Sequence, residues 1–482
     1  MAFTVQIDAE AAPLISFPWR HMIWVPGEWR ETNPSDFLPK VLPLAFENRQ
    51  LEESVSRHQQ SLKSTIKHEF LAWKREEHEF LAWKREEPGN ESHINDSYYW
   101  DAHKRLLEID VQHMRDVYGL DNTTVNDQTV EEVLALDALV VISILIMYFG
   151  LINRLTQRFY NPVFCRFGLR SSKQHILRDL FLLEQQLPMP LLHKTLSTII
   201  CGTEEAISDQ LKIVLTQLLF WIYPFRKPAF QDLSQHATGN ELTLPINHSL
   251  DKLLEYHHLL ECLHQVICTG TQEQRLPLLI LSYLKPDIGV FSTHQVPPVS
   301  ELRKAGITIK SGAGTIDKAR FEGAILNLPQ LSVYDNTASI LRNLAAFEIL
   351  VYQDPLYLCP YLVLLGNLAQ TKQDVQLLIK NDVIVNCLGS ESQMKKMLNG
   401  LCRNMPVSLR GTLEWHMMLS DIQEHYKNER HTLLNEFRQT YCSKLWVIAS
   451  TTAAVFLLSM SFLQTLYTTL SFYYTLLGFW FS

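Results

Sequence analysis

The stretch Asp179–Leu192, DLFLLEQQLPMPLL, carries apolar residues at the three-to-four spacing of a helix, and so does Ile207–Ile222, ISDQLKIVLTQLLFWI. This spacing gathers the apolar side chains on one side of a helix, where a core can cover them. The helical pattern runs from Val130 to Phe225 and returns from Thr337 to Tyr352 and onward. We therefore expect a mainly α-helical globular body.

The composition is that of a folded protein with a large core. Of the 482 residues, 46% are hydrophobic, 20% charged and 10% aromatic, which excludes a disordered, collagenous or low-complexity chain. Lys and Arg total 43 against 51 Asp and Glu, a net charge of −8, so no general basic field is present to hold nucleic acid. The eight cysteines form no CxxC pair, and we expect a reducing compartment rather than a disulfide framework or a zinc finger.

The pattern changes from helical to β between Ile307 and Val333. The segment ITIK is followed by Gly312 and Gly314 and then by ARFEGAILNLP, which is typical of short paired strands. We expect a small β-hairpin element at about 305–333, with Gly312–Gly314 as its hairpin turn. The two glycines lack the GxxxxGK spacing of a phosphate-binding loop.

Residues 1–60 are expected to form an extended strap on the core, because proline breaks helices and tryptophan requires burial. The residues that indicate it are Pro18, Trp19, Trp24, Pro26, Trp29, Pro34, Pro39 and Pro43. The main domain, 61–443, then opens with a tandem repeat, because His68–Glu77 (HEFLAWKREE) recurs unchanged as His78–Glu87. On one helix, Phe70, Trp73, Phe80 and Leu81 would share a stripe that leaves out Leu71. We interpret the repeat as a local duplication tolerated at the surface, and the alternative is a dedicated partner-binding helix.

The C-terminal run Leu445–Phe481 contains 37 residues and no Asp, Glu, Lys or Arg. The steps from Trp446 to Tyr467 would cover about 31 Å, which matches a hydrocarbon core of about 30 Å. We expect a transmembrane helix over 445–467 and an apolar interfacial tail over 468–482. The apolar run Ala138–Ile152 (ALVVISILIMYFGLI) is too short for a second span, and we expect it to be a buried helix.

The flanking charges predict which side of the membrane holds the body. Basic residues precede the C-terminal run and none follows it, which places the bulk of the chain in the cytosol of a single-pass, tail-anchored protein. These residues are Lys427, Arg430, Arg438 and Lys444. Met1–Pro13 has no basic residue and no long apolar run, so a cleaved signal peptide is not expected. An apolar stripe on a long helix leads toward the anchor through Trp415, Leu419, Ile422, Tyr426, Leu433, Phe437 and Tyr441.

The densest group of possible metal ligands lies between residues 255 and 264. It comprises Glu255, His257, His258, Glu261, Cys262 and His264. On one helix, His257, Glu261 and His264 would project from the same face, but the order is neither HExxH nor HxxEH and no fourth ligand is evident. Histidines clustered on a helix are usually solvated, so no metal, catalytic or cofactor-binding residue is assigned and no cofactor is expected.

Three acids lie within apolar blocks, Asp179, Glu184 and Glu348. Asp179 and Glu184 are separated by about 140° around a helix and form no obvious acid–base pair. We expect such buried carboxylates to cap backbone amides. No nucleophile elbow, phosphate loop or kinase motif is present in the sequence.

Several blocks together resemble a plant family called domain of unknown function 247, also named uncharacterised protein family 0481, over roughly Ile23–Phe472. They are Asp179–Pro188 (DLFLLEQQLP), Val299–Lys310 (VSELRKAGITIK), Phe321–Leu331 (FEGAILNLPQL), Leu341–Glu348 (LRNLAAFE), Asp374–Leu378 (DVQLL), Ile384–Leu388 and the C-terminal apolar segment. The chain departs from the family pattern at Gln185, where asparagine is usual, and at Leu42–Phe46. The resemblance implies a plant membrane-associated protein without established catalytic residues. Certain grass members are implicated as pollen-side determinants of self-incompatibility.

We therefore expect a non-enzymatic, membrane-anchored recognition or regulatory protein that binds a still unknown protein partner. Two alternatives stay open. One is a hydrolase-like enzyme whose site is assembled from distant carboxylates such as Asp179, Glu184 or Glu348. The other is a purely structural membrane adaptor.

The sequons at Asn90, Asn95, Asn122 and Asn247 provide a test of orientation. A cytosolic body is expected to leave them unmodified and to be digested by protease added to intact microsomes. The measurement is gel mobility with and without a glycosidase. A glycan on Asn90 or Asn247 would place the body in the lumen.

Overall fold

The computed structural model describes most of the chain between Val25 and Trp480. The described residues are 25–42, 44, 61–72, 74–75, 96–118, 120, 125–149, 172–200, 202–225, 250–268, 296–312, 314–352, 355–403, 405, 411–427 and 445–480. The second copy of the decapeptide, His78–Glu87, and the four sequon asparagines lie outside these ranges.

Helices dominate the described structure, which confirms the predicted mainly α-helical body. The α-helices are α1 (Gly27–Thr32), α2 (Pro34–Phe37), α4 (Asp96–Leu107), α5 (Val111–Tyr118), α6 (Asp127–Phe149), α8 (Lys173–Asp179), α9 (Met189–Ile199), α10 (Glu204–Ile222), α11 (Leu259–Cys268), α13 (Val299–Lys304), α14 (Thr337–Val351), α15 (Leu358–Leu368), α16 (Lys372–Lys380), α17 (Glu391–Leu401), α18 (Leu413–Lys427) and α20 (Leu445–Trp480). The 3₁₀ helices are η1 (Leu183–Gln185), η2 (Leu250–Leu254) and η5 (Ile316–Lys318).

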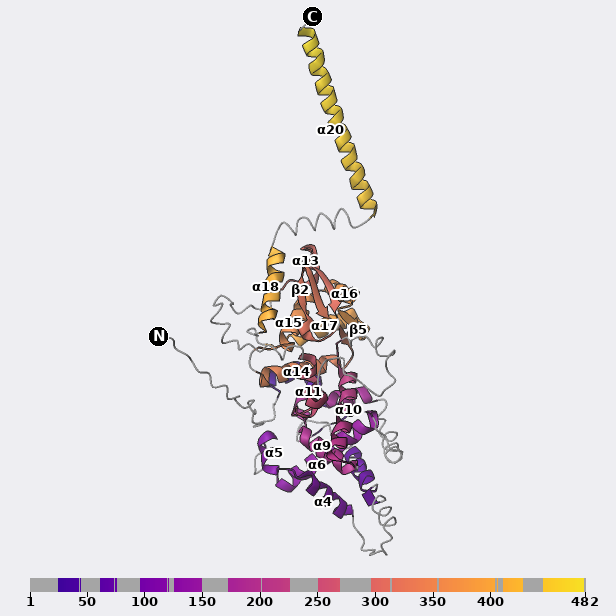
Figure 1. Ribbon diagram of the computed structural model, residues 1–482, viewed down its shortest axis with the longest axis vertical. Helices are drawn as coiled ribbons and strands as arrows, with labels where there is room; N and C mark the ends of the chain where they lie inside the picture. The colour runs from indigo at the N-terminus through magenta and orange to yellow at the C-terminus, as the bar shows by residue number, and fades with distance from the viewer. Residues whose placement is uncertain are drawn as a thin grey trace, which may run out of the picture.

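Helix α6 lies at the centre of one end of the body, where it contacts α4, α5, α9 and α10 (Figure 1). Its second half, Ala138–Phe149, contains no charged residue, as expected of a segment enclosed by other helices. Its length and composition would also suit a membrane span, but 72% of its most apolar window is buried inside the protein. The prediction that the apolar run from Ala138 forms a buried helix is therefore confirmed for the residues up to Phe149.

The helix over 61–72 packs against this end of the body and includes the first five residues of the first decapeptide copy, His68–Ala72. Phe70 is buried and its ring lies 5.0 Å from that of His103. Leu71, which the helical geometry places outside the predicted stripe, is buried as well. A buried ion pair between Lys63 and Asp137 ties this helix to α6.

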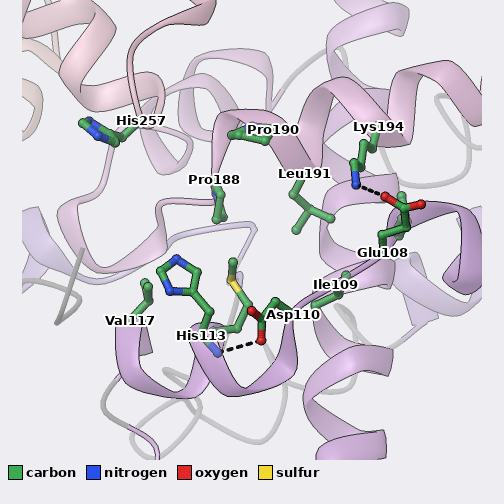
Figure 2. A pocket seen from close by; sticks show the side chains of 12 residues that line it. Glu108, Ile109, Asp110, His113, Val117, Pro188, Pro190, Leu191, Lys194 and His257 are labelled. Carbon is green, nitrogen blue, oxygen red and sulfur yellow. Dashed lines mark hydrogen bonds and ion pairs between the residues drawn. The ribbon is translucent and has the colours of Figure 1, made fainter. Parts of the chain in front are cut away.

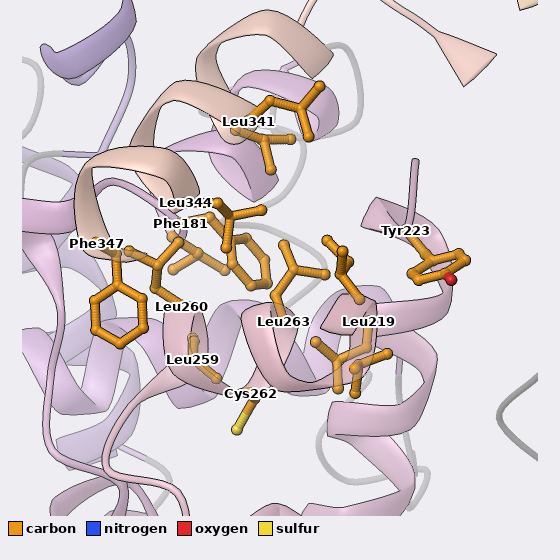
Figure 3. Close-up of a cluster of buried hydrophobic side chains, with 14 of the residues drawn as sticks. Phe181, Leu219, Tyr223, Leu259, Leu260, Cys262, Leu263, Leu341, Leu344 and Phe347 are labelled. Carbon is orange, nitrogen blue, oxygen red and sulfur yellow. The ribbon is translucent and has the colours of Figure 1, made fainter. Parts of the chain in front are cut away.

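Helix α14 joins the two ends of the body. It contacts α2, η1 and α11 on one side and α15 and α17 on the other. In Figure 3 Leu341, Leu344 and Phe347 of α14 face Leu260 and Leu263 of α11 in a continuous hydrophobic cluster. Helices α15 and α17 approach closely at Gly366, because a Cβ atom there would lie 2.2 Å from Sγ of Cys402.

The β element is real, but its topology differs from the prediction. Strands β1 (Thr308–Gly312), β3 (Ile325–Pro329) and β2 (Arg320–Glu322) form a sheet in that order, with β1 parallel to β3. The hairpin joins β2 to β3 at Gly323 and Ala324, whose φ angles of 55° and 62° suit a tight turn. Gly312–Gly314 is therefore not the hairpin turn. After Gly314 the chain forms η5 and crosses to the far edge of the sheet.

A second, two-stranded sheet was not predicted. Strand β4 (Leu331–Val333) pairs in parallel with β5 (Ile384–Asn386), which follows α16. Two parallel strands need a long connection between them. Because β4 and β5 have three residues each and lie more than fifty positions apart, no local sequence pattern indicates that they pair.

Two further predictions need correction. The segment 180–188 is not helical, because α8 ends at Asp179 and only η1 intervenes before α9. Most of its side chains are buried, so the segment is apolar without having a helical face. In the described part of the predicted strap, 25–42 and 44, Trp29 and Phe37 are buried, and the chain forms the short helices α1 and α2 rather than a wholly extended segment.

The stripe predicted on the helix before the C-terminal run is confirmed over α18, where Trp415, Leu419 and Ile422 are buried. The stripe residues beyond Lys427 lie outside the described part of the chain. Helix α20 then runs 36 residues without interruption, so no helix end separates the predicted span, 445–467, from the predicted tail. No residue of the candidate span Ala449–Tyr474 is buried, and α20 stands apart from the body (Figure 1).

The buried positions predict the cost of core truncation. Leu183→Ala and Phe347→Ala are each expected to lower the free energy of unfolding by about 2 to 5 kcal/mol, because burial is lost and a cavity remains. Met417→Ala, at a position 55% exposed on α18, is the matched control and should change it little. Thermal melting of the three variants measures the difference. An unchanged melting temperature for both core variants would refute the core assignment.

Candidate functional site

Asp179, one of the three predicted acids, binds the backbone of the N-terminal strap. Its Oδ2 accepts hydrogen bonds from the N–H groups of Lys40, Val41 and Leu42 at 3.0, 2.8 and 3.0 Å. Its Oδ1 lies 2.8 Å from Nη1 of Arg178, which is also buried. Burial raises the pKa of the Asp179 carboxyl, while the three N–H groups and the guanidinium act in the opposite direction.

Glu184 holds the beginning of the described strap. Its Oε1 accepts the N–H of Val25 at 2.7 Å, and its Oε2 pairs with the guanidinium of Arg30. Both acids of the 179–188 block therefore contact the strap, and their hydrogen-bond partners among the described residues are backbone N–H groups and arginine side chains. This agrees with the expectation that they cap backbone amides.

Glu348, near the C-terminal end of α14, also binds backbone N–H groups. Its Oε1 accepts the N–H groups of Tyr357 and Leu358 at 2.8 and 2.9 Å, and its Oε2 accepts that of Cys359 at 2.7 Å. These donors open α15, where the helix dipole favours an anion. Burial alone would raise the pKa of Glu348, but the His264 hydrogen bond and charge, together with the backbone donors, lower it on balance.

The histidine-rich segment is divided between the surface and the core. Because α11 begins at Leu259, His257 precedes the helix, and its Nδ1 lies 2.8 Å from the Glu261 carboxylate. His264 instead points into the core, where its Nε2 lies 3.2 Å from Oε1 of Glu348. The predicted grouping of His257, Glu261 and His264 is therefore wrong. Within the described part of the chain, the group that could hold a metal ion is His264, Cys268 and Glu348, whose ligand atoms all lie within 4.8 Å of one another.

A surface pocket of about 280 Å³ lies between the α4–α5 turn and the start of α9 (Figure 2). Its walls are mainly apolar, with Leu107, Ile109, Met114, Val117, Pro188, Pro190 and Leu191. The remaining lining residues are Glu108, Asp110, His113, Lys194 and His257. Glu108 and Lys194 form an ion pair of 2.6 Å across it.

Local structure fixes the shape of this pocket. Asp110 caps α5, because its Oδ1 accepts the N–H of His113 at 3.0 Å. Glu108 ends α4 with φ at 47°, a left-handed conformation that is uncommon for a residue with a side chain. The N–H of Met189 donates to the carbonyl of His257 at 2.7 Å and brings that histidine to the rim.

Sequence reasoning missed this pocket, because its residues come from three separate segments. The available signals were weak: the PMP sequence at Pro188–Pro190, which starts α9, and the acids that flank Ile109. Among the described residues that line the pocket there is no serine, threonine or cysteine.

Two buried histidines predict how stability depends on pH. Burial lowers the pKa of His103 and of His258 to about 4. The unfolded chain, with a histidine pKa of about 6.5, binds these protons first, so stability should fall as the pH drops from about 6.5 to 4, by about 1.4 kcal/mol per pH unit for each group. His258→Asn should remove the contribution of His258 to the pH dependence of the free energy of unfolding, because asparagine does not titrate. The fold should be kept, since Oδ1 of the asparagine can replace Nδ1 as the acceptor of the Glu261 N–H.

The measurement is urea unfolding at a series of pH values, with the more exposed His257→Asn as control. An equal slope for wild type and His258→Asn would contradict the assigned burial effect.

Comparison with known proteins identifies relatives whose names state no activity. A putative UPF0481 protein of Arabidopsis thaliana is 30% identical over 172 residues, which are 35% of this chain and 32% of the relative. Another UPF0481 protein of the same plant is 22% identical over 326 residues, 65% of this chain and 63% of the relative. The alignments thus span less than two thirds of either relative. No solved structure matches the chain.

A family model described as "plant protein of unknown function", DUF247, matches residues 23–460. The match includes the strap, both ends of the body and the first part of α20. The chain therefore belongs to the DUF247 family of plant proteins of unknown function.

Proposed function

We propose that this protein is anchored in a membrane by α20 and uses its helical body to recognise another protein. The observation that carries the proposal is the exposed apolar surface of α20, a 36-residue helix without Asp, Glu, Lys or Arg. A soluble protein rarely exposes so large an apolar surface. In a bilayer that same surface meets lipid, and all interior backbone groups of the helix are satisfied within it.

The length of α20 fits one tilted crossing. The candidate span within it, Ala449–Tyr474, has 26 residues and extends about 39 Å, longer than a hydrocarbon core of about 30 Å. The four basic residues between Lys427 and Lys444, with none after them, favour a cytosolic body. A single-pass protein with its bulk in the cytosol is the arrangement that we propose.

The pocket beside α9 is the proposed recognition site. Its volume, about 280 Å³, falls just below the range of about 300 to 1,000 Å³ typical of small-molecule sites. Apolar walls of this size suit an inserted aliphatic or aromatic side chain of a protein partner, which is how many interfaces place their main anchor. The polar rim, with Asp110, His113 and His257, would then meet the partner's flanking backbone.

A non-enzymatic role is part of the proposal. Asp179, Glu184 and Glu348, the acids considered for catalysis, each bind backbone N–H groups and a basic or imidazole side chain. A carboxylate so occupied is poorly placed to exchange protons with a substrate. Recognition on the pollen side of self-incompatibility is one biological setting in which such a protein could act.

The test combines the anchor with a pocket variant. Full-length protein is expected to stay in the membrane pellet after an alkaline carbonate wash, whereas a chain ending at Lys444 should be released. In proximity labelling in plant tissue, Met114→Glu should lower the labelling of specific partners at least tenfold, because a charge would enter the apolar pocket.

Met417→Glu, on the exposed part of α18, is the matched control and should keep the partner set. Melting curves of both variants check that the body is folded. Release of the full-length chain by carbonate would overturn the anchor. An unchanged partner set for a folded, membrane-bound Met114→Glu protein would overturn the pocket.

A further inference from the structure

His264, Cys268 and Glu348 bring three different metal-binding groups together in the core. His264 and Cys268 lie one turn apart on α11, and Glu348 comes from α14, which packs against α11 (Figure 3). All three residues are at least 95% buried. His264 Nε2 is 3.2 Å from Oε1 of Glu348 and 3.6 Å from Sγ of Cys268.

These distances match the spacing of ligands around a tetrahedral metal ion. Zinc bonds of about 2.0 to 2.1 Å to nitrogen, 2.0 to 2.2 Å to oxygen and 2.3 Å to sulfur imply separations of about 3.4 Å for nitrogen to oxygen and about 3.6 Å for nitrogen to sulfur. The two observed separations lie within about 0.2 Å of these values. An ion could enter with little movement of the side chains.

The charges also suit a divalent cation. An ionised Glu348 and a Cys268 thiolate would together neutralise a 2+ ion, so the buried site would carry no net charge when His264 is neutral. Burial raises the pKa of the Cys268 thiol well above its usual range, so binding must displace its proton to solvent. Oε1 of Glu348, the oxygen nearest His264, also accepts the N–H groups of Tyr357 and Leu358, and Oε2 accepts that of Cys359, so a bound cation would share the carboxylate with these backbone donors.

We propose that His264, Cys268 and Glu348 bind a transition-metal ion of the Zn²⁺ class within the core. Imidazole, thiolate and carboxylate are the ligand types that zinc takes in proteins. The site would link α11 to α14 and hold Glu348 at the start of α15. The competing explanation is that the three side chains form a hydrogen-bonded cluster and bind no ion.

Cobalt titration of the purified full-length chain in detergent separates these explanations. The wild-type protein, stripped with a chelator, is expected to bind one equivalent of Co²⁺ and to show the near-ultraviolet absorption of a thiolate–cobalt bond. Cys268→Ser should abolish that absorption and weaken Co²⁺ binding at least tenfold. His264→Gln and Glu348→Gln should weaken binding similarly.

Cys262→Ser is the matched control, because Cys262 is buried on the same helix but its Sγ donates to the carbonyl of Leu253 at 3.4 Å. It should bind cobalt as the wild type does. Circular dichroism before metal addition identifies any variant that does not fold. Absence of stoichiometric cobalt binding by the folded wild type would overturn the proposal, and so would a thiolate–cobalt absorption that survives Cys268→Ser.

Discussion

The buried ion pair of Arg178 and Asp179 is the contact on which the arrangement of the body depends. Asp179 binds three consecutive N–H groups of the strap, while Arg178 donates to the carbonyl of Leu38 at 3.0 Å and to Oγ of Ser339 at 2.9 Å. One pair of side chains thus fixes the strap, the end of α8 and the start of α14 relative to one another. Removing one partner of a buried ion pair costs about 3 to 5 kcal/mol, so loss of either Arg178 or Asp179 would weaken all of these contacts.

Three other acids, Glu184, Glu348 and Asp374, also bind backbone N–H groups where two segments of the body meet. Glu184 binds the N–H of Val25, Glu348 binds the first turn of α15, and Asp374 joins α13 to α16 by accepting the N–H groups of Ser300 and Thr371 at 2.9 and 2.8 Å. A backbone amide buried without a partner is costly, and a carboxylate can satisfy two or three at once. The acids that appear as isolated charges in apolar blocks therefore have an architectural explanation.

The buried acids that bind backbone groups are distinct from the pocket and the membrane helix proposed for function. The core acids are engaged by backbone, whereas the pocket beside α9 has apolar walls and an exposed polar rim. In Figure 1 α20 lies at the opposite end of the molecule from α4, α5 and α9, whose residues line the pocket, so membrane anchoring and recognition could operate at opposite ends. The proposed metal site lies between them, where α11 meets α14, and would stiffen the region that connects the two ends.

What the sequence by itself determined is what depends on neighbours along the chain. The period of 3.6 residues identified the helical body, the uncharged run identified α20, and the short apolar run before Arg154 was correctly taken as a buried helix. Only the tertiary structure decided the non-helical path of 180–188, the parallel pairing of β1 with β3, the partners of Asp179 and Glu348, and the grouping of His264 with Cys268 and Glu348. The physical reason is that a segment covered on all sides loses its periodic pattern, and a buried charge takes partners that can lie more than a hundred residues away.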